Sequence, residues 1–158
     1  MTKRLAAILA IATLVSASLG GSPAARAESA GPLSARANYI LRCTGCHGLE
    51  GAGSEIGGIP DFRGYVGAFS RTEDGRAYLM HVPGVVNSSL TNAEIAAVMN
   101  YVMQTFGGKS LPADYKPFTV EEVDALRAHP VEDVVAYRRD VVKALTAVGI
   151  ATAGYPWP

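Results

Sequence analysis

Apolar residues recur at helical spacing in several segments of the chain. The clearest segment is 91–106, where Thr91 and Glu94 form a capping-box pattern at the start and two glycines follow the end. Shorter helices are predicted over residues 34–42 and 75–81. Together these patterns predict an all-α fold. The apolar positions of the longest segment lie three or four residues apart: Ile95, Val98, Met99, Val102, Met103 and Phe106.

Two further helices are predicted near the end of the chain, after a proline-containing linker at residues 111–118. Thr119 and Glu122 repeat the capping-box pattern. The helix that they begin ends before Pro130, because a residue that precedes proline disfavours the helical conformation. Residues 131–148 carry apolar side chains mostly on one face. Both helices must bury their apolar faces, so we expect them to pack on the preceding helices.

Glycine and proline mark the loops between the predicted helices. Residues 48–58 contain five glycines, and residues 82–89 contain Pro83 and Gly84, so both segments are predicted to be irregular. Residues 60–69, which follow the first loop, are rich in aromatic side chains. The aromatic candidates for the core or for a ligand pocket are Tyr65 and Phe69 from this segment, and Tyr78 and Tyr101 from the helices that follow it.

The N-terminal residues have the features of an export signal. Lys3 and Arg4 precede an apolar run at residues 5–19, and Ala25-Arg26-Ala27 fits the small-x-small cleavage pattern. The apolar run is shorter than the ~20 residues of a membrane span, although an uncleaved N-terminal anchor is the alternative. We therefore predict that residues 1–27 are a cleaved signal peptide, and that the mature protein is periplasmic with no membrane span.

Removal of the signal peptide changes the charge of the chain. The 158 residues include 14 basic and 14 acidic side chains, a formal net charge of zero. Cleavage after Ala27 removes Lys3, Arg4 and Arg26 but no acidic residue, which leaves 131 residues with a net charge of −3. A mildly acidic chain argues against nucleic-acid binding, which needs a basic excess. Its length fits a single domain.

The two cysteines of the chain belong to its most specific motif. Cys43, Cys46 and His47 match Cys-x-x-Cys-His, the attachment pattern for a c-type haem. Two thiols one helical turn apart can form thioethers with the two vinyl groups on one edge of the porphyrin. The next residue then lies under the iron, where His47 can offer an imidazole nitrogen. Haem c is attached outside the cytoplasm, which agrees with the predicted export.

A dithiol redox pair and a zinc site are the alternatives for this motif. A disulfide across so short a loop stabilises a fold little, so it would suit redox chemistry better. Zinc lacks a second pair of ligands, because His81 and His129 are remote and mismatched in spacing.

With this motif, the sequence resembles the class I monohaem c-type cytochromes over residues 32–106. Residues 33–41 resemble the family's N-terminal helix, which leads into Cys43-Thr44-Gly45-Cys46-His47-Gly48. Residues 91–102 resemble its last core helix. The resemblance implies a cytochrome c-like helical core around one covalently attached haem c.

The resemblance also implies roles for individual residues. Cys43 and Cys46 are the thioether residues, and His47 is the proximal axial ligand. In this family a proline after the motif accepts a hydrogen bond from the other ring nitrogen of that histidine, which fixes the ring orientation. Pro60 is the candidate for this role, and an ordinary loop proline is the alternative.

The chain is longer than a minimal class I cytochrome. The sequence from Gly75 onward resembles a two-lobed subgroup, in which an added helical lobe closes over the haem. We therefore expect a core domain over residues 28–110 and a C-terminal helical extension over residues 111–158 that packs on the core. A tail docked elsewhere on the core is the alternative.

The sixth iron ligand is where the sequence departs from the family. Class I cytochromes usually supply methionine from a Met-Pro loop before the last core helix, but Val82 precedes Pro83 here. Met80 is the favoured candidate. The alternatives are His81, Met99, Met103 or no ligand, and both Met99 and Met103 can equally be core residues. Three arginines are candidates for the haem propionates, or else ordinary surface residues: Arg63, Arg71 and Arg76.

These observations predict a periplasmic one-electron carrier rather than an enzyme. Its partners would be redox proteins that dock transiently, and it is expected to be a monomer that binds no nucleic acid. One alternative is a haem enzyme or sensor with an open or labile sixth iron site, either peroxidase-like or binding small ligands. Another is an electron-transfer subunit of a dehydrogenase complex, with the C-terminal helices as the interaction surface.

Overall fold

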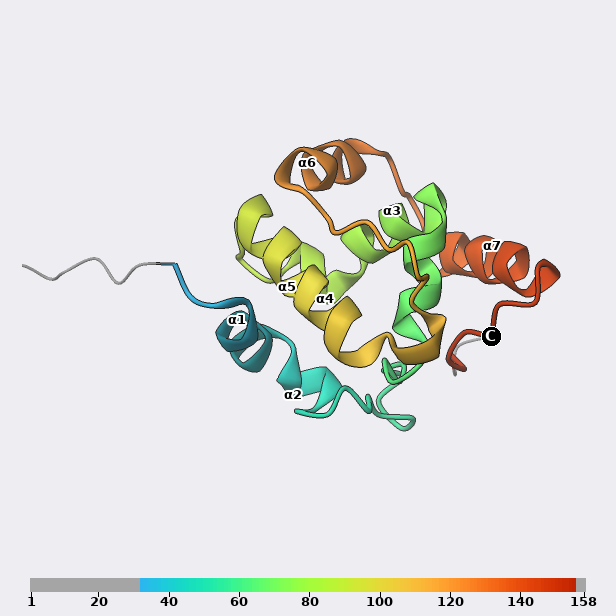
Figure 1. Ribbon diagram of the computed structural model, residues 1–158, viewed down its shortest axis with the longest axis horizontal. Helices are drawn as coiled ribbons and strands as arrows, with labels where there is room; N and C mark the ends of the chain where they lie inside the picture. Colours follow the sequence, from blue (N-terminus) through green and yellow to red (C-terminus); the bar gives the residue numbers. More distant parts are fainter. Residues whose placement is uncertain (1–31, 156–158) are drawn as a thin grey trace, which may run out of the picture. The chain divides into compact units, whose positions relative to one another are not determined.

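A computed structural model describes residues 32–155, which fold into helices joined by loops (Figure 1). These residues contain no named β-strand; Ser54 and Ile59 form one isolated bridge. The all-α prediction is confirmed. In chain order the elements are α1 (Ala35–Arg42), α2 (Thr44–His47), the 3-10 helix η1 (Val66–Arg71), α3 (Glu73–His81), α4 (Pro83–Val86), α5 (Asn92–Phe106), the 3-10 helix η2 (Gly108–Ser110), α6 (Val120–Ala128) and α7 (Val134–Ala147).

The helix boundaries follow from capping residues. Both halves of the predicted capping box at α5 are present: the Thr91 side chain accepts from the Glu94 N–H, and the Glu94 side chain accepts from the Thr91 N–H. Helix α7 begins later than the apolar pattern predicted. The Asp133 carboxylate caps it by accepting from the Val135 and Ala136 N–H groups at 2.9 and 3.0 Å.

Part of the predicted loop at residues 82–89 is helical. Pro83 is the first residue of the short helix α4. Proline suits this position because its fixed φ is helical and because an N–H in the first turn would make no hydrogen bond within the helix. Helix α3 begins two residues before the predicted start, because the Thr72 hydroxyl caps it by accepting from the Gly75 N–H at 3.0 Å.

Helix α1 packs across α5 through a cluster of aromatic rings. Tyr39 is buried, and its ring centroid lies 5.5 Å from that of Tyr101 and 5.3 Å from that of Phe106. Its hydroxyl donates to the Gly48 carbonyl at 2.7 Å. Burial raises the pKa of Tyr39 to about 12. Tyr39 therefore connects the packing of α1 on α5 to Gly48, the residue that follows the Cys-x-x-Cys-His motif.

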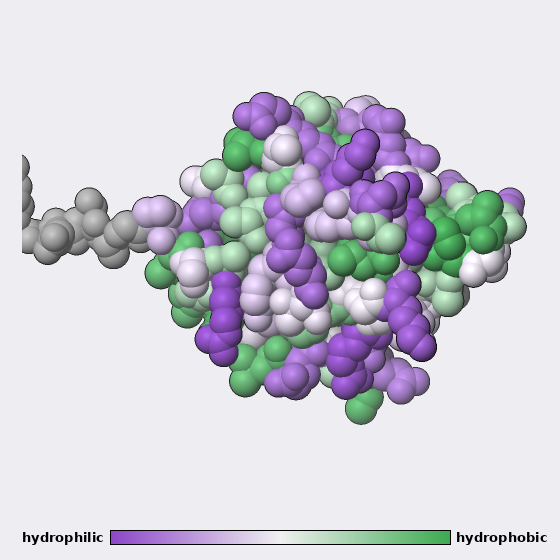
Figure 2. Space-filling model, viewed as in Figure 1, coloured by the Kyte–Doolittle hydropathy of each residue, from purple (hydrophilic) through white to green (hydrophobic). Residues whose placement is uncertain are grey.

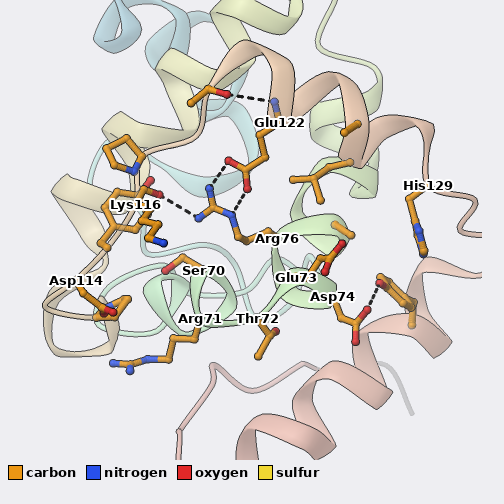
Figure 3. A pocket seen from close by; sticks show the side chains of 18 residues that line it. Ser70, Arg71, Thr72, Glu73, Asp74, Arg76, Asp114, Lys116, Glu122 and His129 are labelled. Atoms are coloured by element: carbon orange, nitrogen blue, oxygen red, sulfur yellow. Dashed lines mark hydrogen bonds and ion pairs between the residues drawn. The ribbon is translucent and has the colours of Figure 1, made fainter.

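The C-terminal helices pack on this core, α6 against α3 and α5, and α7 against α3. A partly buried ion pair joins α3 to α6: the Arg76 guanidinium donates to both carboxylate oxygens of Glu122 at 2.5 and 2.6 Å (Figure 3). The same guanidinium donates to the Lys116 carbonyl at 3.2 Å and lies 3.7 Å above the Phe118 ring. Arg76 thus fixes both the linker and α6 against α3.

The face of the molecule shown in Figure 2 is mainly hydrophilic, and its hydrophobic side chains form small groups. None of the helices within residues 32–155 has the length and the apolar character needed to cross a bilayer. The predicted signal peptide, residues 1–27, lies outside the described residues.

Candidate functional site

The Cys-x-x-Cys-His motif lies at the end of α1 and in the single turn of α2. The Thr44 hydroxyl donates to the Ile40 carbonyl at 2.8 Å, which connects the first residue of α2 to α1. Cys43 is half-buried, Cys46 is exposed, and both are free thiols. Burial, together with the neighbouring Cys46, raises the pKa of Cys43. The two thiols are therefore held one helical turn apart, next to His47.

The imidazole of His47 is held by stacking on the ring of Phe62, with 3.7 Å between ring centroids and 19° between ring planes. Burial lowers the pKa of His47 to about 4, and the Pro60 backbone acts in the opposite direction. The ring is therefore neutral near pH 7, the form in which histidine binds metals. Its Nδ1 is buried and makes no hydrogen bond of good geometry, so the bond to the Pro60 carbonyl stays a prediction.

The glycine-rich loop brings Pro60 back toward the motif. The Gly53 N–H donates to the His47 carbonyl at 3.1 Å, and Gly53 has a φ of +68°. A Cβ at this position would lie 2.3 Å from the Ile59 carbonyl oxygen and 2.5 Å from that of Pro60. Only glycine fits this close approach of the two backbones.

We predict that Gly53→Ala lowers the free energy of unfolding by about 1–3 kcal/mol, because it combines a strained positive φ with a backbone clash. Denaturant unfolding measures this change. Gly154→Ala is the matched control, because a Cβ there meets nothing within 4 Å and its φ lies outside the left-handed region. Equal stability of the two variants would contradict the role assigned to Gly53.

A cavity of about 370 Å³ opens beside the motif and is lined by Cys43, Cys46, His47 and Pro60. This volume lies within the ~300–1,000 Å³ range of cofactor pockets. Loops, η1, α3, the 82–90 segment, α5 and the C-terminal extension all contribute to its walls. Its apolar lining includes Ile59, Phe62, Val66, Phe69, Leu79, Val82, Val85, Leu90, Ile95, Val98, Met99 and Val102.

These residues fit a haem. One wall carries two thiols and a neutral buried imidazole, and most of the remaining surface is apolar, as a porphyrin macrocycle requires. Cys43 and Cys46 would hold the macrocycle covalently, and His47 would bind its iron. The part of the chain that the structure describes contains no group of three or more His, Cys, Asp or Glu side chains suited to a bare metal ion.

The structure separates the candidates for the sixth ligand. Met99 lines the cavity, whereas Met80 and Met103 do not and are fully buried in the core. His81 also does not line the cavity, and its Nδ1 lies 2.8 Å from the Ala77 carbonyl oxygen one turn earlier in α3. Met80, which the sequence favoured, is thus fully buried and is not among the residues that line the cavity, so its role as the sixth ligand stays a prediction.

None of the three arginines proposed for the haem propionates lines the cavity. Arg63 pairs with Asp61 at 2.8 Å, Arg71 donates to the Ser110 carbonyl at 3.0 Å, and Arg76 pairs with Glu122. Of the aromatic candidates, Tyr65, Phe69 and Tyr78 line the cavity, and Tyr101 packs on Tyr39 instead.

The sequence analysis expected an added lobe near the haem but did not single out the residues of the C-terminal extension that line this cavity. Val134, Arg138, Ala153 and Tyr155 line it. A signal was present in the sequence, because Arg138 lies four residues after Val134 and three before Val141, on the apolar face of α7. A basic residue on a face that must be buried is unusual.

A second, larger hollow of about 890 Å³ lies between α3, α6, α7 and the linker, and it is lined mainly by polar side chains (Figure 3). Arg76 and Glu122 neutralise each other there, and Tyr137 donates to Asp74 at 3.0 Å. No residue of the Cys-x-x-Cys-His motif lines it. It is therefore a separate feature between the helices and not part of the site at His47.

Two known proteins are similar to this chain over most of their own length. No family model matches the chain. The chain is 33% identical to a cytochrome c-552 of Thermus thermophilus over 141 aligned residues, covering 77% of this chain and 90% of the relative. It is also 33% identical over 123 residues to another cytochrome c-552 of Thermus thermophilus, covering 65% of this chain and 93% of that protein. The chain thus belongs to the class I c-type cytochromes, with covalently attached haem c as its cofactor.

Proposed function

We propose that the protein is an exported, periplasmic carrier of single electrons between redox proteins. The observation that carries this proposal is the combination of two thiols and a neutral, buried imidazole on one wall of an apolar cavity. When bound, haem supplies an iron that changes between the ferric and ferrous states. The chain's own residues hold the haem, orient the proximal imidazole and exclude water from the cavity.

Surface exposure near the motif supports transfer to a docked partner. Cys46 is exposed and Cys43 is half-buried, so the edge of the haem that they hold would lie near the protein surface. The mature chain carries a net charge of only −3, which gives weak electrostatic steering. Weak, short-lived docking suits redox partners, whose interfaces lie at the small end of the range.

We further propose Met99 as the sixth iron ligand of this carrier. Apart from His47, it is the one methionine or histidine within the described residues that lines the cavity. Its thioether sulfur is a known haem ligand type, and the Met/His pair raises the reduction potential. Met103, one turn further along α5, is also buried but does not line the cavity.

A small-ligand-binding haem protein is the second candidate, and one observation favours it. The segment in which class I cytochromes usually carry the ligand contributes only Val82, Pro83, Gly84, Val85, Ser88 and Leu90 to the cavity. None of these side chains offers sulfur or an imidazole nitrogen. If Met99 only packs against the haem, the sixth position is open to diatomic ligands.

Visible spectroscopy of the haem-loaded protein separates the two candidates. The carrier predicts a low-spin, six-coordinate iron, a far-red ferric band from sulfur ligation, and a reversible one-electron potentiometric titration. Met99→Leu should abolish that band, and Met103→Leu should retain it as the matched control. A high-spin spectrum that changes on adding carbon monoxide would overturn the simple carrier and support ligand binding.

A further inference from the structure

We propose that Arg138 of α7 binds a propionate carboxylate of the haem, so that the C-terminal extension is part of the haem site. The inference rests on haem c binding and is independent of whether the protein is a carrier or a ligand sensor.

Within the described part of the chain, Arg138 is a buried charge without a charged partner. It is only 6% exposed. One Nη donates to the Ala153 carbonyl at 2.9 Å, while Nε is buried and has no hydrogen-bond partner. Within residues 32–155 the ion pairs are Arg63–Asp61 and Arg76–Glu122, so no carboxylate pairs with Arg138. Leaving a charge buried and uncompensated is strongly unfavourable, which indicates an anion at this position when the cavity is filled.

The second buried arginine shows what a complete partner set looks like in this fold. Arg76 is 9% exposed. Two of its guanidinium nitrogens donate to the Glu122 carboxylate, the third donates to the Lys116 carbonyl, and the guanidinium stacks on the Phe118 ring. Arg138 has the carbonyl and the ring, with Tyr155 centred 4.5 Å from its guanidinium carbon, but lacks the carboxylate. Arg76 is outside the haem cavity, and Arg138 lines it.

The surroundings of Arg138 suit a carboxylate. The side chains of Tyr78 and Tyr155 line the same cavity, and each brings a hydroxyl. Burial raises the pKa of Tyr78, while the neighbouring Arg138 guanidinium acts in the opposite direction. The Tyr78 hydroxyl therefore remains protonated near neutral pH and can donate a hydrogen bond. Guanidinium and tyrosine hydroxyl groups both donate hydrogen bonds to carboxylates.

The position of α7 agrees with the chemistry of the haem. Helix α2, with its thiols, and α7 lie well apart in Figure 1, yet both line one cavity. Haem carries its propionates on the edge away from the vinyl groups that form the thioethers. A haem held at Cys43 and Cys46 would thus direct carboxylates away from α2. Because the cavity joins α2 to α7, the inference assigns one of those carboxylates to Arg138.

The test compares reduction potentials of the haem-loaded wild type, Arg138→Gln and Arg139→Gln. Arg139 is the exposed neighbour on the same helix, so its variant loses the same charge outside the cavity. We expect Arg138→Gln to shift the equilibrium toward the ferric form roughly tenfold, which is ~59 mV for one electron. The cause is that an uncompensated carboxylate near the iron favours the more positive state. Arg139→Gln should change little, because solvent screens exposed charges.

Redox-induced infrared difference spectra give a second readout that needs no activity. The carboxylate bands of the propionates should move in Arg138→Gln and stay in place in Arg139→Gln. Should Arg138→Gln fail to fold, Arg138→Lys serves, because a lysine point charge replaces the two-pronged guanidinium and should also move the bands. Equal potentials in the two glutamine variants, or carboxylate bands that are unchanged in every Arg138 variant, would overturn the proposal.

Discussion

A chain with alanine in place of both Cys43 and Cys46 is expected to lose covalently attached haem and, with it, most of its folded structure. The cavity beside these residues has a volume of about 370 Å³ and a largely apolar lining. Left unfilled, it costs at most ~9 kcal/mol at ~24 cal/mol per Å³. That is as large as the whole stability of a typical domain, ~5–15 kcal/mol.

Far-UV circular dichroism and the visible spectrum measure the two losses together. The matched control is the unchanged chain produced without haem attachment, which should have the same low helix content as the double variant. Wild-type protein carrying haem should show the helix content of α1 to α7. A double variant that keeps full helicity without haem would contradict the view that the cofactor is part of the core.

Replacement of Glu122 by glutamine is expected to lower the free energy of unfolding by about 2–3 kcal/mol, the contribution of hydrogen bonds to charged groups. Arg76, 9% exposed, would then lose the carboxylate that neutralises it. The pair joins α3 to α6, so the loss should loosen the C-terminal extension before the rest of the fold. Hydrogen exchange resolved along the chain should show faster exchange first in α6.

The adjacent Glu121 provides the control for this prediction, because it is exposed and loses the same charge in Glu121→Gln. That variant should change stability by less than ~0.5 kcal/mol, as is usual for surface substitutions. A double-mutant cycle with Arg76→Met then isolates the pair. A coupling energy near zero between Arg76 and Glu122 would show that the ion pair does not hold the extension.

The sequence predicted those parts of the fold that local chemistry determines. The capping box at Thr91 and Glu94 located α5, and the similar pattern at Thr119 and Glu122 located the start of α6. At α6 the Thr119 side chain accepts from the Glu122 N–H as expected, but the Glu122 carboxylate turns to Arg76 instead of the cap. A tertiary ion pair thus replaced half of a local motif, which no pattern within one helix could reveal.

The residues of the candidate site likewise fall into those that local sequence reveals and those that only tertiary packing reveals. Cys43, Cys46 and His47 are adjacent in the chain, so their shared chemistry is visible in the sequence. The roles of Met80, Met99 and Arg138 depend on which way each helix turns its faces in the packed molecule. Met80 and Met99 are both apolar residues at helical spacing, and only packing gives Met99 access to the cavity. Arg138 becomes informative only when it is known to be buried and to pair with no carboxylate among residues 32–155.

Peptide mass spectrometry after denaturation and trypsin digestion tests most directly that haem is held by this motif. Cleavage after Arg42 and Arg63 releases one peptide, residues 43–63, that contains both cysteines and His47. We predict that this peptide retains the mass and the visible absorption of one haem after acid–acetone extraction. A peptide of unmodified mass, with haem extracted into the solvent or absent, would contradict the account.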